Sequence, residues 1–586
     1  MGVPGFFKKQ LEENKRSDKK FLLKKEDNQL EESIREEINN IDYLLIDANC
    51  LIHPQCAKIL SENENYSNLD SLENSMMNQS LAYIQSLYEY IRPNIGIYIA
   101  IDGPAPYAKM KQQRYRRFKS YHDKIMYNNI KKKHNRPVTK DWNSSAITPG
   151  TLFMEKLHNK IIEWSQQRDY QVMYSSCKTP GEGEHKLLQF IRDNQSNNIN
   201  YRYMMYGLDA DLIFLCLSTN IDDMYLLRES NQINKRDTGY SIVSIDRLRT
   251  SIYDTINNKL LEKEQSCMVQ IDDKHKVIND YIFICYFLGN DFLPHNPAID
   301  IYDGGYDLLL DTYIELLGLN ECSEFMINRD NRNIINNVMF KHYMEMLANK
   351  EEDLLKEQHT RIIRKHRCQS TDPYDIELHR INNLMFRVND PIELGKGEKD
   401  EWKQRYYEYY FHIEETEEET KEETKEGDLI ESMVDEYLKG LKWVTEYYFK
   451  DCMSWEWYYP FSHPPFLEDI FNVINRKNID INSYKIKKGK PLEPLNQLLQ
   501  VLPPQSMGLV PRALRKIALH PDSPASYLYP IRFEQDFIGK RMYWMGEPKL
   551  PPMNFELVNE LYKRYKKKLN REEKLSNRTE NLFIFN

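Results

Sequence analysis

Seven carboxylates beside short apolar runs constrain the fold of this chain more than any other feature of its sequence. Each lies where an apolar run gives way to a turn, in the segments YLLIDAN, IYIAIDG, PGEGEHK, MMYGLDADL and FLGNDFLP. The seven acids are Asp47, Asp102, Glu182, Glu184, Asp209, Asp211 and Asp291. Because the carboxyl ends of parallel strands meet at one crevice of an open α/β sheet, acids this far apart in sequence can share one site.

A cluster of this kind needs cations to neutralise it. Two unit charges about 4 Å apart repel by roughly 1 kcal/mol in water and by roughly 4 kcal/mol at an effective dielectric constant near 20. Hard oxygen ligands, with no Cys or His among them, suit Mg²⁺ or Mn²⁺ and not zinc. Two such ions about 3.5–4 Å apart stabilise the attacking and leaving oxygens in phosphodiester hydrolysis. The acids therefore predict a site for two divalent ions.

Each acidic motif also has a structural interpretation when it is taken alone. Asp209 and Asp211 are two residues apart, so in extended backbone both point to one side, but a lone DAD is more often a turn with capping acids. Glu182 and Glu184 follow a Pro-Gly pair, where a helix N-terminus favours acids for structural reasons. The presence of all these motifs in one chain favours the metal site.

The order of apolar runs and helical patterns predicts an α/β fold with a mostly parallel sheet flanked by helices. Short runs of strand length lie at 43–48, 95–101, 170–174, 203–206 and 212–217. Helical patterns lie between them, at 151–168 and 184–193. Residues 107–136 lack Gly and Pro and predict one long exposed helix, whereas the polar residues 61–80 predict a surface insertion.

The charge of the chain is unevenly distributed. The net charge of −9 argues against a generally basic nucleic-acid binder, yet residues 107–140 carry twelve Lys and Arg against a single acid, Asp123. The segment 413–428, IEETEEETKEETKEGD, is acidic and of low complexity, so we expect a disordered loop or linker.

Length and composition place the chain among multidomain globular proteins. Its 586 residues, 41% of them hydrophobic, can bury a large core. No apolar run of about 18 residues appears, and the first residues lack the apolar stretch of a signal peptide. Nine scattered cysteines without a CxxC pair fit a reducing compartment and exclude a disulfide framework or a zinc ribbon.

The two ends of the chain share long, specific motifs with one family. The first half contains MGVPGFF, IDANCLIH, IDGPAPYAKMKQQRYRRFKS, ITPGTLFMEKLH, PGEGEHK, GLDADLI, GNDFLPH and GGYDLLLDTY. The second half contains LKWVTEYYFKDCMSWEWYYPFSHPPFLEDI, PPQSMGLVP, SPASYLYP and LNREEKLSNR. These segments resemble the first and second homology regions of the eukaryotic XRN family of 5′-to-3′ exoribonucleases.

This resemblance implies a fold, a division of the chain and a role for the acids. The seven acids match those that hold two Mg²⁺ or Mn²⁺ ions in the family, on a core shared with flap endonucleases and PIN-like nucleases. We expect a nuclease core at 1–320, a helical connector at 321–436, and a second α/β region at 437–586 that packs on the core and completes the substrate channel.

The same resemblance assigns a pocket for a 5′-monophosphate to Lys109, Gln113, Arg116 and Arg117. These residues lie at i, i+4, i+7 and i+8, so they share one face of the expected helix. Taken alone, such a charge run is more often a solvated face. A compact pocket of Lys and Arg would suit a terminal phosphate and sterically reject a cap.

Stacking residues for a terminal base are also implied by the family. His53 would form one side of a sandwich, and Trp455 or Trp457 of the SWEW segment would form the other. Taken alone, each of the three is more often an ordinary core or surface residue. Stacking contributes about 1–3 kcal/mol per base and ignores base identity, which suits processive digestion.

The predicted function is a processive, Mg²⁺-dependent 5′-to-3′ exoribonuclease that acts in RNA and mRNA decay. Its substrate would be single-stranded RNA with a 5′-monophosphate, and we expect a monomer in the cytoplasm or nucleus, without a membrane partner. One alternative is a flap-endonuclease-like 5′ nuclease on DNA, although FLPHNPAIDIYDGGYDLLL after Asp291 lacks the Gly-rich helical hairpin of those enzymes. A second alternative, a non-catalytic RNA-binding scaffold, is disfavoured because all seven acids are present.

Two departures from the family pattern stand out. The chain begins MGVPGFF where members usually begin MGVPKF, and it ends soon after LNREEKLSNR, so we expect a compact member. High use of Asn, Ile, Lys and Tyr suggests an AT-rich coding genome, such as that of a large DNA virus or a protist.

Overall fold

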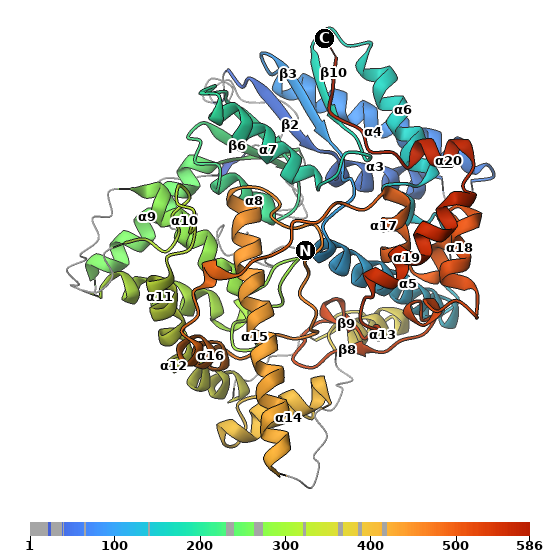
Figure 1. The fold of residues 1–586 in the computed structure, drawn as a ribbon. Helices are drawn as coiled ribbons and strands as arrows, with labels where there is room; N and C mark the ends of the chain where they lie inside the picture. The colour runs from blue at the N-terminus through green and yellow to red at the C-terminus, as the bar shows by residue number, and fades with distance from the viewer. Residues whose placement is uncertain are drawn as a thin grey trace.

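An eight-stranded sheet lies at the centre of the computed structural model, with strand order β1-β7-β6-β5-β2-β3-β4-β10 (Figure 1). The structure describes residues 22–24, 38, 40–63, 66–138, 141–229, 239–262, 273–319, 324–360, 367–384, 390–412 and 419–585. The strands are β1 (Leu22–Lys24), β2 (Tyr43–Asp47), β3 (Gly96–Ala100), β4 (Gln171–Ser175), β5 (Tyr203–Tyr206), β6 (Met224–Glu229), β7 (Tyr240–Ser244) and β10 (Phe583–Phe585).

Parallel pairing joins the middle of this sheet. Strands β6, β5, β2, β3 and β4 pair in parallel, whereas β7, β1 and β10 join antiparallel at the two edges. Successive side chains of a strand point to opposite faces. In β2, Leu44 and Ile46 therefore enter one apolar core, and Tyr43 and Leu45 enter the other. The predicted α/β fold with a mostly parallel sheet is confirmed.

Helices cover both faces of the sheet. One face packs against α3 (Ala48–Glu62), α4 (Leu69–Ile91) and α6 (Leu152–Ser165). The other face packs against α7 (Gly183–Ser196), α8 (Asp211–Leu217) and α9 (Ile245–Glu262). The apolar core on this face continues away from the sheet into α10 (Lys274–Cys285), α11 (Gly305–Leu317), α12 (Asn337–Thr360), α15 (Glu419–Phe449) and α16 (Leu467–Lys477).

The remaining helices lie around α5 (Tyr107–Lys133) and at the lower end of the molecule in Figure 1. Residues of α5 share an apolar cluster with the C-terminal helices, and the Tyr107 ring stacks on Phe555 at 3.7 Å. These elements are α13 (Pro373–Asn382), α14 (Lys399–Phe411), α17 (Pro494–Val501), α18 (Arg512–Leu519), α19 (Phe555–Tyr565), α20 (Arg571–Ser576), and the two-stranded sheet of β8 (Gln535–Asp536) and β9 (Glu547–Pro548).

Several predictions about single elements were wrong. Residues 212–217 form α8 and not a strand, because a buried apolar run of this length fits either structure. Most of the expected insertion at 61–80 belongs to α4, whose Met76 and Met77 are buried. Residues 419–428 of the acidic segment form the first turns of α15, and residues 413–418 lie outside the described residues.

The helix predicted at 107–136 exists as α5, but it is not an exposed helix throughout. Arg114 is buried, and its guanidinium donates hydrogen bonds to the Gln500 and Leu528 carbonyls. Lys111 Nζ donates to the carbonyl oxygens of Tyr459 and Phe461 at 2.8 and 2.6 Å. The second half of the chain therefore holds one side of α5 in place.

Candidate active site

One cavity of about 460 Å³ lies at the carboxyl ends of the parallel strands. It contains all seven predicted acids, His53 and the four predicted α5 residues. Strands β5 and β2 are neighbours in the sheet. From β2 the chain continues to β3 and β4 on one side, and from β5 it continues to β6 and β7 on the other. The cavity therefore lies at the point where the strand order reverses, which is where open α/β sheets bind ligands. The topology thus brings together acids that are up to 244 positions apart in the sequence, between Asp47 and Asp291.

Asp47 is the last residue of β2, and Asp102 follows the end of the neighbouring strand β3 by two residues. Asp47 is 4% exposed, and its Oδ1 has no hydrogen-bond partner among the described residues. Asp102 Oδ1 accepts a hydrogen bond from the Gly183 N–H, and its Oδ2 accepts one from Asn49 Nδ2, both at 2.7 Å. Asp102 is therefore fixed in position, whereas one oxygen of Asp47 is left available for a ligand.

Glu182 and Glu184 lie at the start of α7, as the sequence predicted. Glu182 is the N-cap residue and Glu184 lies in the first turn. Both are buried, and Glu182 Oε1 accepts a hydrogen bond from the Tyr447 hydroxyl at 2.9 Å. This contact links the acids of the first half of the chain to α15.

Asp209 and Asp211 lie together at the cavity, but not on a strand. Asp211 is the buried first residue of α8, and Asp209 is an exposed residue of the loop after β5. Arg228 supports this loop by donating to the carbonyl oxygens of Leu208 and Asp209. The expected geometry of two acids on one side of a strand was wrong, because the run that follows them is helical.

Most of the acids are buried, and they repel one another. Loss of hydration, followed by the charge of Asp102, raises the pKa of Asp47 to about 8. Burial also raises the pKa of Glu184 well above its usual value. The Lys109 ammonium pairs with Glu182 and lies 2.8 Å from Asp291 Oδ2, and the acids raise its pKa although burial opposes them. The acids thus place oxygen donors around the positively charged ammonium of Lys109, and oxygen donors are the ligands that divalent ions such as Mg²⁺ prefer.

Lys109, Gln113, Arg116 and Arg117 of α5 line the same cavity as the acids and form its cationic wall. Gln113 is buried and accepts a hydrogen bond from Gln497 at 3.4 Å, whereas Arg116 is exposed to the cavity. Burial, together with the charge of Arg116, lowers the pKa of Arg117 to about 9. Two adjacent guanidinium groups that repel each other favour an anion between them.

The residues predicted to stack on a base are only partly brought together. His53 lines the cavity, where loss of hydration and the charges of Arg116 and Arg117 lower its pKa to about 4. Neither tryptophan lines this cavity. Trp457 is buried and donates its indole N–H to Glu436 at 3.1 Å, whereas Trp455 is half-buried. Of the two tryptophans, Trp455 remains the candidate for stacking.

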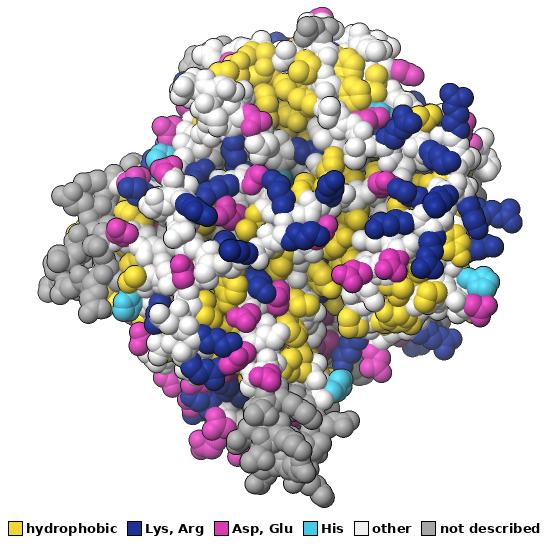
Figure 2. All heavy atoms as spheres, viewed as in Figure 1, with side chains coloured by type: hydrophobic (Ala, Val, Ile, Leu, Met, Phe, Trp, Pro, Cys, Tyr) yellow, Lys and Arg dark blue, Asp and Glu magenta, His cyan; other side chains and the backbone are white. Residues whose placement is uncertain are grey.

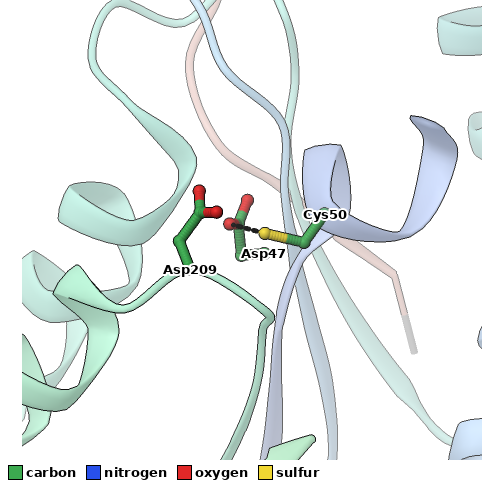
Figure 3. A group of neighbouring side chains, drawn as sticks. All are labelled: Asp47, Cys50 and Asp209. Carbon is green, nitrogen blue, oxygen red and sulfur yellow. Dashed lines mark hydrogen bonds between the residues drawn. The ribbon is translucent and has the colours of Figure 1, made fainter. Parts of the chain in front are cut away.

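Sequence reasoning missed other residues of the cavity. Asn49 and Cys50 follow Asp47 in the first turn of α3, and the Cys50 thiol donates a hydrogen bond to Asp47 Oδ2 at 2.8 Å (Figure 3). Ser506 reaches the cavity from the second half of the chain. The position of Asn49 and Cys50 in the motif IDANC was the available signal, whereas Ser506 lies in the motif PPQSMGLVP, which gave no sign that this serine reaches the cavity.

Comparison with known proteins identifies the family. The description "XRN 5'-3' exonuclease N-terminus" matches residues 1–230, and "Xrn1 helical domain" matches residues 271–383 and 380–586. The chain belongs to the XRN family. Similar proteins include human 5'-3' exoribonuclease 1, at 28% identity over 94% of this chain and 34% of the relative. Arabidopsis thaliana 5'-3' exoribonuclease 2 is 28% identical over 84% of this chain and 60% of its own length.

A third similar protein comes from yeast. Saccharomyces cerevisiae 5'-3' exoribonuclease 1 is 25% identical over 92% of this chain and 42% of its own length. The XRN chain described here thus spans about a third to three fifths of the length of these relatives. Across the described residues, none of the helices has the length and apolar character needed to span a membrane.

Proposed function

We propose that this XRN family member is a divalent-metal-dependent 5′-to-3′ exoribonuclease of RNA decay. Its substrate would be single-stranded RNA with a 5′-monophosphate, and its products nucleoside 5′-monophosphates. The observation that carries the proposal is that one cavity joins the acids at the sheet edge to the cationic face of α5. Its volume of about 460 Å³ lies within the range of small-ligand pockets.

The acids would hold the ions, and the donor set fits them. Asp47 offers a buried oxygen without a partner among the described residues, and six other carboxylates line the same cavity. Bound Mg²⁺ or Mn²⁺ ions would supply an activated water and neutralise charge on the scissile phosphate. Lys109 would contribute a further positive charge beside Glu182 and Asp291.

The cationic wall would select the 5′ end of the RNA. Gln113, Arg116 and Arg117 present donors to the cavity, and charge-assisted contacts from a guanidinium fork are directional. His53, neutral at physiological pH because its pKa is lowered to about 4, would offer a flat face to the terminal base. Sequence-independent stacking together with a terminal phosphate site would favour stepwise digestion from one end.

A substrate panel tests this proposal. Purified protein with Mg²⁺ is given one RNA sequence with a 5′-monophosphate, a triphosphate, a cap or a hydroxyl, alongside single-stranded and flapped DNA. We expect mononucleotides to be released progressively from the monophosphorylated RNA and little cleavage of the capped RNA. Cleavage at flap junctions in preference to RNA would instead support the DNA nuclease.

Asp209→Asn serves as the matched variant in this assay. It removes one ligand charge from an exposed loop position, so we expect hydrolysis to be lost while the fold and RNA binding are retained. RNA binding is measured in EDTA by fluorescence anisotropy. Hydrolysis close to the wild-type rate in a nuclease-free preparation would contradict the metal assignment.

A further inference from the structure

Cys50 brings a sulfur atom into a cavity whose predicted metal ligands are all oxygens. It lies in the first turn of α3, lines the cavity, and donates its thiol proton to Asp47 Oδ2 at 2.8 Å. In Figure 3 the thiol and the Asp209 carboxylate approach Asp47 from opposite sides. No other cysteine lines this cavity among the described residues.

The three side chains have the spacing of ligands to one ion. One ligand atom from each of Asp47, Cys50 and Asp209 lies within 4.8 Å of the other two. A tetrahedral zinc ion with bonds of about 2.3 Å to sulfur and about 2.0–2.2 Å to oxygen holds its ligand atoms about 3.5 Å apart, so side-chain rotations must bring the three ligand atoms closer together. The buried Asp47 Oδ1, which has no partner among the described residues, provides the independent sign that this cluster takes a ligand.

We propose that Asp47, Cys50 and Asp209 form a mixed thiolate and carboxylate site for a thiophilic divalent ion such as Zn²⁺ or Cd²⁺. On binding, the thiol releases its proton to solvent and a sulfur–metal bond replaces the hydrogen bond to Asp47. A thiolate ligand strengthens the preference for Zn²⁺ over Mg²⁺ beyond that of an all-oxygen cluster.

Such an ion would inhibit the proposed nuclease. It would hold two of the seven acids in the geometry that the sulfur imposes, and it would thereby compete with the hard ions at those acids. This consequence rests on the proposed function, but binding of the ion to the three side chains does not.

Binding is tested with Co²⁺ alone as a spectroscopic probe of the full-length protein. Cobalt bound to a thiolate gives a sulfur-to-metal charge-transfer absorption that carboxylates do not give. We expect this band in the wild type and its loss in Cys50→Ser, which keeps a hydrogen-bond donor in place. Cys56→Ala is the matched control, because Cys56 lies on the same helix, is buried, and does not line the cavity. A band of equal intensity in Cys50→Ser would overturn the proposal.

Inhibition is tested separately in excess Mg²⁺, with each variant compared with its own rate in the absence of Zn²⁺. Half-inhibition of Cys50→Ser should require more than about tenfold more Zn²⁺ than that of the wild type, since loss of even an outer-shell partner changes metal affinity by about 10–100-fold. Equal sensitivity would refute the inhibitory role. If the protein has no nuclease activity, the cobalt band still decides whether the site exists.

Discussion

Uncharged neighbours position several charged residues of the cavity. The Gly183 amide and the Asn49 side chain hold Asp102, and the Tyr447 hydroxyl holds Glu182. These contacts orient carboxylates without neutralising them, so the negative charge remains available to bound cations. On the cationic wall, burial and then the charge of Arg116 lower the pKa of Arg117.

Replacing Arg117 with Ala tests the role of this wall. We expect the ratio of kcat/KM on monophosphorylated RNA to that on hydroxyl-ended RNA to fall by roughly 10- to 100-fold, because a hydrogen bond to a charged group contributes about 1.5–3 kcal/mol. Arg116→Ala should act in the same direction. The control is Lys132→Ala, at an exposed position of the same helix outside the cavity. Equal losses on both substrates would make α5 a nonspecific RNA track.

The sequence was a good guide to the acids and a poor guide to their neighbours. Each acid lies in a short motif beside a turn, which is a local signal. Cys50 lies in the motif IDANC, but whether its thiol reaches the cavity depends on the rotation of α3. The place of Ser506 in the cavity depends on the docking of a segment more than 300 residues away from α5. Long-range packing of this kind leaves no pattern in one sequence.

Among the elements, α12 and α16 are joined by a buried acid. Glu351 on α12 is 3% exposed and accepts hydrogen bonds from the amides of Leu467 and Glu468 at 2.8 and 3.0 Å. These donors are orphan N–H groups of the first turn of α16. Burial raises the pKa of Glu351 to about 7, although the two amides oppose the shift.

The contribution of Glu351 to the free energy of unfolding should therefore fall as the pH rises. A folded-state pKa above the unfolded value means that the contribution is fully present below about pH 4.5 and is lost as the pH rises through about 7. The free energy of unfolding of the wild type, relative to Glu351→Gln, should fall by up to roughly 3 kcal/mol between these limits. Denaturant titrations at several pH values measure this, with Glu345→Gln on the same helix as control. A difference that does not change with pH would contradict the assignment.

The acidic start of α15 offers a second test at this scale. Deleting residues 414–427 should leave turnover within about twofold and the melting temperature nearly unchanged, because the deletion removes the acidic first turns of α15 and the segment before them, and the length of a connecting segment affects closure entropy only weakly. Among the described side chains of α15, Leu429 lies beyond the deletion and belongs to the same apolar cluster as Phe411 of α14. A large loss of activity or stability would show that the acidic turns contact the rest of the protein.

The sequence predicted an element correctly where the length of the segment and its hydrophobic pattern indicated the same structure, as in β2 and α7. It failed at 212–217 because a short buried run has no periodicity to distinguish a strand from a helix. It also failed for the buried side of α5, because Lys and Arg there donate to backbone carbonyls of the second half of the chain. The charge of these residues suggested that they face solvent, but their hydrogen bonds hold them against the second half of the chain.

Across the whole molecule, the last residues complete the first sheet. Strand β10 pairs antiparallel with β4, and the preceding Glu580 lies 3.2 Å from the ammonium of Lys178 and accepts a hydrogen bond from Ser176. Lys178 is buried and lies four residues before Glu182. The C-terminal segment therefore supports the loop that carries two of the site acids.

Truncation after Arg578 tests this support. It should lower the melting temperature strongly and reduce activity, although none of the removed residues lines the cavity. Loss of one partner of a buried ion pair costs up to about 3–5 kcal/mol, and among the acids that the structure describes Lys178 would keep Glu155 at 3.0 Å. Ile584→Thr, at a position 59% exposed, is the control and should change little. An active truncated protein of normal stability would contradict this role for β10.

Strand β10 is synthesised long after its partner strand β4, and this delay has a consequence for folding during synthesis. Ribosomes make β4 some four hundred residues before its edge partner at 583–585. Throughout that time the nascent chain presents an unpaired strand edge, which is a template for association with other chains. We therefore expect the growing polypeptide to depend on chaperones that shield this edge, and isolated N-terminal fragments to aggregate when they are expressed alone.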